Sequence, residues 1–118
     1  MDAGTQVGLT EDQVKSILDI RRQRSAIFGE GLFSDPAWDI LLELLAARLG
    51  RRKTTLSSLN RIAPKSVIGR WVALLEERGL VACDCNPLRP HQFCIRLNDE
   101  CADRVIRFLS AARHLQCE

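Results

Sequence analysis

Residues 64–81 read PKSVIGRWVALLEERGLV, and this run predicts a helix followed by the start of a strand. Proline fits a first helical position because its missing N–H costs nothing there, so we expect the helix to begin at Pro64. Gly79 is expected to end it, since glycine accepts the left-handed backbone that closes many helices. Apolar side chains at helical spacing predict one buried face, formed by Ile68, Trp71, Val72 and Leu75. The residues left outside are Lys65, Ser66, Gly69, Arg70 and Ala73.

Two segments upstream can pack against this helix. Asp35 followed by Pro36 is a strong helix start, because an Asp side chain accepts the free N–H groups of a first turn. The helix that begins there ends at Gly50 and carries an apolar stripe, formed by Trp38, Leu41, Leu42, Leu45 and Leu49. The segment 51–56 then predicts a short strand, and a serine at 57 or 58 can cap a short helix that ends near residue 62.

The two ends of the chain complete the pattern. Thr10 and Gln13 match a capping box, and they open a first helix that runs to about residue 27. Residues 80–85 and 92–97 alternate in polarity and predict a β-hairpin with its tip at residues 86–91. Asn98 opens a last helix that runs close to the end of the chain. The order of elements is that of a winged helix, so we predict a mainly α (α+β) fold with a small antiparallel β-wing.

Three pieces of the sequence resemble the MarR-type winged helix-turn-helix transcriptional regulators. They are the helix start Asp35-Pro36-Ala37-Trp38-Asp39, the pair Arg70-Trp71 and the segment Leu75-Glu76-Glu77-Arg78-Gly79-Leu80-Val81. The resemblance runs from about residue 41 to residue 109. It implies one DNA-binding domain over residues 10–118, with dimerisation helices at 10–28 and 98–115 and a disordered tail at 1–9.

Charge is distributed unevenly along the chain, although the formal net charge is only +2. Between Leu44 and Leu75 there is no Asp or Glu. The same stretch holds seven cations: Arg48, Arg51, Arg52, Lys53, Arg61, Lys65 and Arg70. A surface that is merely solvated normally mixes both signs, so a stretch of one sign favours a nucleic-acid partner. A solvated helix with polar residues outside is the alternative.

The resemblance assigns DNA-contacting roles to individual residues. In helix-turn-helix proteins the second helix enters the major groove. The resemblance assigns this role to the helix at 64–78 and places the wing at 80–97 near the minor groove. The major-groove residues are Lys65, Ser66, Gly69 and Arg70, where glycine lets the backbone approach the duplex. The phosphate-holding residues are Ser57, Ser58, Arg61 and Arg89. Arg89 resembles a wing arginine, although the tip lacks the family's usual acidic-then-basic pattern and the turn before residue 64 is about two residues short.

The resemblance also implies a homodimer formed by the first and last helices. The residues that would contact the partner subunit are Val14, Ile17, Leu18, Val105, Phe108, Leu109 and Ala112. The alternative is that both stripes cover the core of their own subunit. We expect the dimer, because a chain of 118 residues buries so many apolar helix faces with difficulty on its own.

Other function classes find little support in the sequence. Five cysteines and no export signal predict reduced thiols and a cytoplasmic protein without a membrane span. Cys83, Cys85 and Cys94 lack a histidine at ligand spacing, so we expect no metal and no cofactor. Cys101 lies in the first turn of the last helix, where the helix dipole can lower a thiol pKa. His91 and His114 have no nucleophile or carboxylate constellation around them, so we expect no enzyme.

The leading hypothesis is a sequence-specific regulator that binds double-stranded DNA, and the resemblance implies a repressor. A second hypothesis is a winged-helix protein-interaction module whose cationic surface meets an acidic partner. A third is a regulator controlled by thiol oxidation or by a small-molecule effector, which the resemblance would place near Trp38.

Overall fold

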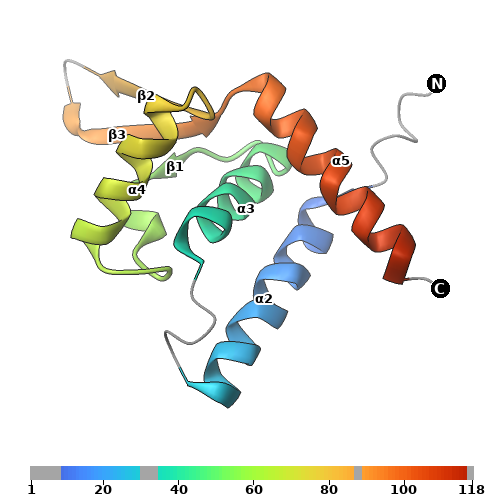
Figure 1. Cartoon of the computed structure of the whole chain (residues 1–118). Helices are drawn as coiled ribbons and strands as arrows, with labels where there is room; N and C mark the ends of the chain where they lie inside the picture. The colour runs from blue at the N-terminus through green and yellow to red at the C-terminus, as the bar shows by residue number, and fades with distance from the viewer. Residues whose placement is uncertain (1–8, 30–34, 87–88, 117–118) are drawn as a thin grey trace.

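The computed structural model describes residues 9–29, 35–86 and 89–116, with side chains placed except at 85–93 and from 112 onward. Its helices are α2 (Glu11–Phe28), α3 (Pro36–Leu49), α4 (Lys65–Glu77) and α5 (Asp99–Gln116). Its strands are β1 (Thr54–Thr55), β2 (Val81–Asn86) and β3 (Arg89–Leu97), and η1 (Ser57–Leu59) is a short 3-10 helix. The chain is thus mainly helical with a small antiparallel sheet, and the elements follow one another in the predicted order (Figure 1).

Two helix starts form as the sequence predicts. Thr10 and Gln13 make the complete capping box of α2. The Gln13 N–H donates to the Thr10 hydroxyl at 3.2 Å, and the Thr10 N–H donates to the Gln13 side-chain oxygen at 2.8 Å. Asp35 accepts the N–H of Trp38 at 3.2 Å, and Pro36 takes the first helical position of α3. Both caps satisfy N–H groups that have no partner within the helix.

The entry into α4 differs from the prediction. Pro64 stands at the N-cap, one position before the helix, and provides no side-chain cap. The preceding short helix η1 ends at Leu59 instead of near residue 62, and no serine caps it. The end of α4 is as predicted, because Gly79 adopts a φ of +74° directly after the helix.

The sheet has the strand order β1-β3-β2, and both pairings are antiparallel. Ile95 in the middle strand β3 pairs with Thr54 of β1 on one side and with Cys83 of β2 on the other. The strands of the hairpin extend further than predicted, since residues 89–91 belong to β3 and not to the turn. The register shifts between Asp84 and Asn86, so the outer part of the hairpin departs from the regular pairing nearer its base.

Helix α3 lies in the centre of the molecule, with α2 on one side and α4 on the other (Figure 1). Its buried residues are Ile40, Leu42, Leu44, Leu45, Ala46 and Ala47. The prediction of a single apolar stripe was too narrow for this helix, because neighbours surround it on several sides. Trp38, Leu41 and Leu49 from the predicted stripe are only partly buried.

The helices predicted to dimerise bury most of their apolar residues inside their own subunit. Val14 and Leu18 of α2 are 0% and 4% exposed, and Val105 and Leu109 of α5 are 5% and 7% exposed. Ile17 is partly buried against the same core, and the side chain of Ala112 lies outside the described residues. The buried members of these stripes cover the subunit's own core, which corrects their assignment as partner-contacting residues, whereas Phe108 is 61% exposed.

Two further expectations concern the chain ends and the membrane. Residues 1–8 of the predicted tail lie outside the described residues, but Leu9 is 2% exposed and belongs to the core, so it is not part of a tail. In the described ranges, no helix combines the length and the apolar composition needed to cross a bilayer.

Candidate nucleic-acid interface

The N-terminal half of α4 presents a polar and cationic surface. Lys65, Ser66 and Arg70 are exposed, whereas the opposite side of the helix is buried through Ile68. A Cβ built on Gly69 would meet no atom within 4 Å, so the backbone there borders open space. The first turn contains no acidic residue and no side-chain cap, and its free N–H groups add partial positive charge.

Lys65 and Arg70 have no carboxylate partner among the residues that the structure describes. Neither side chain forms an ion pair with any of the residues that the structure describes. The acids of α4, Glu76 and Glu77, lie at its other end and are exposed. The cationic surface is therefore confined to the N-terminal half of the helix.

Three of the seven cations in the acid-free stretch are paired with acids from outside it. Arg61 lies 3.1 Å from Glu43, Arg48 lies 2.8 Å from Asp99, and Arg52 contacts Glu11. The hydrogen bond from Arg48 lowers the pKa of Asp99, and that from Arg52 lowers the pKa of Glu11. The surface formed by this stretch therefore carries less unbalanced positive charge than the sequence alone suggests.

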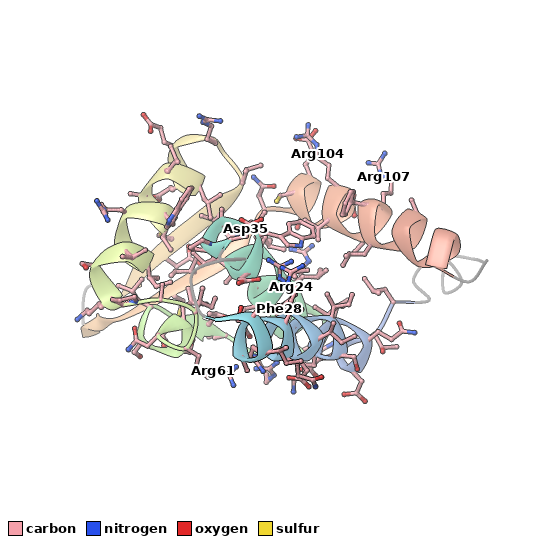
Figure 2. The ribbon with its side chains drawn as sticks, turned by 60° about the horizontal axis from the view of Figure 1, so that its bottom comes forward. Arg24, Phe28, Asp35, Arg61, Arg104 and Arg107 are labelled. Carbon is pink, nitrogen blue, oxygen red and sulfur yellow. The ribbon has the colours of Figure 1, made fainter. Side chains whose placement is uncertain are left out.

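A network of ion pairs ties the turn before α4 to the rest of the protein. Glu43 of α3 accepts hydrogen bonds from Arg22 of α2 at 3.3 Å and from Arg61 at 3.1 Å. Arg21 reaches Asp39 of α3 at 2.5 Å. Figure 2 shows Arg61 on the side of the molecule that carries η1, away from Arg104 and Arg107 on α5. The predicted phosphate-holding residue Arg61 is therefore engaged in a structural contact.

The two predicted phosphate-binding serines also have partners within the protein. The Ser58 hydroxyl accepts the N–H of Thr55 at 3.1 Å and donates to the Thr55 carbonyl at 2.7 Å. The Ser57 hydroxyl lies 3.1 Å from the hydroxyl of Thr55. Both residues are exposed and can still accept a further contact, but their first role is to shape the turn between β1 and η1.

The side chain of Arg89 lies outside the described residues. Its backbone begins β3 and pairs with Asn86, the last residue of β2, so Arg89 lies at the tip end of the hairpin, in the strand and not in the turn. Its contact with a minor groove stays a prediction.

Two of the cysteines with described side chains, Cys83 and Cys101, are shielded thiols. Burial, followed by the nearby Glu76, raises the pKa of Cys83 to about 11. Burial also raises the pKa of Cys101, so the expected lowering by the helix dipole is wrong for that residue. Among the described residues, no group of three His, Cys, Asp or Glu side chains could hold a metal ion.

Sequence reasoning missed the role of Glu43 as the carboxylate that binds Arg61. Its signal was present, because Glu43 interrupts an otherwise apolar run, but the sequence does not say which cation it meets. A hollow of about 520 Å³ adjoins this network between α2, α3 and the turn before α4. Trp38, where an effector was expected, does not line that hollow and packs edge-on against Phe108 at 5.4 Å.

Comparison of the chain with protein-family models, with curated proteins and with solved structures found no match.

Proposed function

We propose that the protein is a sequence-specific transcriptional regulator of the winged helix-turn-helix type that binds double-stranded DNA through α4. The observation that carries the proposal is the exposed N-terminal half of α4, where Lys65 and Arg70 have no counter-charge within the described residues. Two unpaired cations beside an uncapped helix start form a surface that attracts phosphate and the edges of guanine. The MarR-type resemblance favours a repressor.

The chemistry of this surface suits a major groove. An arginine at position 70 can donate two hydrogen bonds to guanine, and Lys65 can reach a phosphate as a point charge. Gly69 leaves room for the helix backbone to approach the duplex closely. The hairpin β2–β3 follows α4 in the chain and packs beside it, as a wing would. The phosphates of the DNA backbone would be contacted by Ser57, Ser58 and Arg89. Arg61 would join them once a phosphate replaces Glu43 as its partner.

We propose further that DNA is bound by a homodimer. The apolar residues that remain outside the subunit core are the candidates for the contact: Ile20 at 65%, Ile27 at 75%, Phe28 at 61% and Phe108 at 61% exposure. All four lie on α2 or α5, the helices that the resemblance assigns to dimerisation. A two-fold dimer would read two half-sites about one helical turn apart.

Selection of bound duplexes from a random DNA library tests the proposal. We expect enrichment of a motif with two-fold symmetry. The Arg70→Ala variant should bind the enriched duplex about tenfold more weakly, because a good base contact contributes on the order of 1–3 kcal/mol. Arg107→Ala is the matched control, since this exposed arginine of α5 carries the same charge away from α4 (Figure 2).

Two results would contradict the proposal. One is the absence of any enriched motif together with equal duplex affinities for the Arg70→Ala and Arg107→Ala variants. The other is stoichiometric capture of an acidic protein that depends on Arg70, without sequence-selective DNA binding. The second result would support a protein-interaction module instead.

A further inference from the structure

We propose that a hollow between the C-terminal end of α3 and strand β3 binds a small molecule that joins an apolar body to a phosphate group. This α3–β3 hollow has a volume of about 470 Å³. Small-molecule sites commonly measure about 300–1,000 Å³. None of its lining residues belongs to α4 or η1, so it lies apart from the proposed major-groove surface of α4. Asp84 and the residues from 94 to 97 belong to the β2–β3 hairpin, so the hollow borders the proposed wing.

Four buried apolar side chains form the floor of the hollow. Leu44 and Ala47 come from α3 and are 2% and 4% exposed. Ile95 and Leu97 come from β3 and are 2% and 1% exposed. An aromatic or aliphatic body placed over these side chains would be removed from water, which is favourable.

The rim of the hollow carries more cations than carboxylates. Four of its side chains are cations and one is a carboxylate: Arg48, Arg52, Lys53, Arg96 and Asp84. Two carboxylates outside the lining, Asp99 and Glu11, pair with Arg48 and Arg52, so the excess of three positive charges is fully available only when a ligand replaces those two carboxylates. A doubly charged phosphate uses this excess better than a singly charged group does. Arginine also matches phosphate geometry with two parallel hydrogen bonds.

Three of the four cations of the rim are available to an incoming anion, whereas Arg52 contacts Glu11. Lys53 forms no ion pair with any described residue. Arg96 meets Asp84 at 2.9 Å, and both side chains are 59% exposed. Arg48 meets Asp99, whose side chain is 91% exposed. Such exposed pairs are weak, so a phosphate can replace their carboxylates.

The buried hydroxyl of Thr54 is a second, independent indication that the hollow binds a ligand. Thr54 lines the hollow and is only 7% exposed, and no described residue hydrogen-bonds to its side chain. Buried polar groups nearly always have a hydrogen-bond partner, and one without a partner is costly. A phosphate oxygen at this position would accept the hydrogen bond that the Thr54 hydroxyl can donate.

The apolar floor distinguishes a small molecule from the backbone of a nucleic acid. Phosphates of a duplex are flanked by sugars and water, and they would leave Leu44, Ala47, Ile95 and Leu97 uncovered. A molecule with both parts uses the floor and the rim together. We therefore assign the hollow to a phosphate monoester with an apolar body.

Calorimetric titration with matched probes tests the assignment. The full-length protein is titrated at pH 7.5 with 1-naphthyl phosphate, 1-naphthyl sulfate, 1-naphthol and inorganic phosphate. The second pKa of a phosphate ester is about 6, so the first probe is mostly a dianion and the sulfate is a monoanion. We expect 1-naphthyl phosphate to bind with 1:1 stoichiometry and at least about tenfold more tightly than each other probe, because only it engages the floor and the charge excess fully.

Two variants locate the binding. Thr54→Val keeps the β-branched shape but removes the hydroxyl, so it should weaken 1-naphthyl phosphate about tenfold. It should leave the melting temperature of the free protein unchanged or higher, which a merely structural role for Thr54 would not predict. Lys53→Gln should weaken the same probe about fivefold. Arg51→Gln is the matched control, because Arg51 is an exposed neighbouring cation that does not line the hollow.

Several outcomes would overturn the assignment. Equal affinity for 1-naphthol would show a hydrophobic hollow without an anion site, and equal affinity for inorganic phosphate would show an anion site without an apolar one. Unchanged affinity in both Thr54→Val and Lys53→Gln would place any binding elsewhere. Competition between 1-naphthyl phosphate and a DNA duplex, with weaker duplex binding by Lys53→Gln, would make the hollow part of a nucleic-acid surface. Failure of the DNA selection would leave the assignment standing.

Discussion

The carboxylate of Glu43 controls how much positive charge is free beside α4. Its side chain is 17% exposed and lies between Arg22 and Arg61, at 3.3 Å and 3.1 Å. A partly shielded carboxylate interacts more strongly with its partners than one in open water. The contact holds Arg61 against α3 and neutralises its charge, so Arg61 does not contribute to the cationic surface that we propose binds DNA.

Replacing this carboxylate should therefore strengthen duplex binding. We expect Glu43→Gln to raise the affinity for duplex DNA at low salt by about two- to threefold, since one more cation can neutralise a phosphate. Titration at several salt concentrations should also show a steeper salt dependence. The control is Glu100→Gln, which removes a paired carboxylate from α5. Unchanged affinity and slope in Glu43→Gln would mean that Arg61 takes no part in binding.

The thiol of Cys83 should react slowly with alkylating agents. Its pKa is raised to about 11 by burial and by Glu76, and the thiolate is the reactive form. At pH 8 the folded protein should be alkylated by iodoacetamide at this residue on the order of a hundredfold more slowly than an ordinary cysteine. The rate should rise with pH until about 11. Peptide mass spectrometry resolves the site, with the protein unfolded in urea as the control.

Rapid alkylation of Cys83 in the folded protein at pH 8 would contradict this account. It would also restore the hypothesis that oxidation of this residue controls DNA binding. Slow alkylation would favour a packing role for the thiol beside the core, as expected for a small apolar side chain.

Among the elements, the three helices before the hairpin begin in different ways. Helices α2 and α3 have side-chain caps from Thr10 and Asp35, but α4 begins after Pro64 with no such cap. The N–H groups of its first turn are thus free for a partner outside the protein. The exposed face of this uncapped helix also carries Lys65 and Arg70, which form no ion pair with the described residues, so both features point to the same surface.

Loss of a helix cap should be measurable as loss of stability. Asp35→Ala removes the acceptor for the Trp38 N–H, and we expect the free energy of unfolding to fall by about 1 kcal/mol. Urea denaturation followed by circular dichroism measures the change. Asp103→Ala is the control, because this exposed Asp in α5 caps no helix. A change of similar size in the control would show that charge, and not the cap, is responsible.

At the scale of the whole molecule, the exposed apolar residues concentrate on two helices. Helices α2 and α5 both contact the central α3, and they carry the exposed apolar residues Ile20, Ile27 and Phe108. Figure 1 shows that their C-terminal halves diverge from each other. Burial of these residues against a second copy would remove apolar surface from water, which supports the proposed homodimer.

A charge placed on this surface should separate the subunits. We expect Ile27→Asp to convert a dimer into a monomer, as measured by light scattering during size-exclusion chromatography, because an unpaired carboxylate in an apolar interface is costly. Asn60→Asp introduces the same charge at an exposed polar position outside α2 and α5 and should leave the dimer intact. A wild-type protein that is monomeric at all concentrations would contradict the proposed homodimer.

Local sequence was sufficient for the helix caps, the helix ends and the order of the elements. The capping box at Thr10, the cap at Asp35 and the left-handed Gly79 all arise from contacts within a few residues. Such contacts depend on residue type and spacing, which the chain displays directly. The exposed face of α4 was foreseeable for the same reason, because helical periodicity separates Lys65 and Arg70 from the buried residues.

Packing was needed to establish which cations are free and which apolar faces remain uncovered. Arg61 and Glu43 are 18 residues apart, and Arg48 and Asp99 are 51 apart, so only the folded chain brings their charges together. The burial of Val14 and Leu18 in the subunit core likewise depends on where α3 lies. Coulomb attraction and apolar burial act through distance in space, and that distance is set by the whole arrangement of helices and sheet.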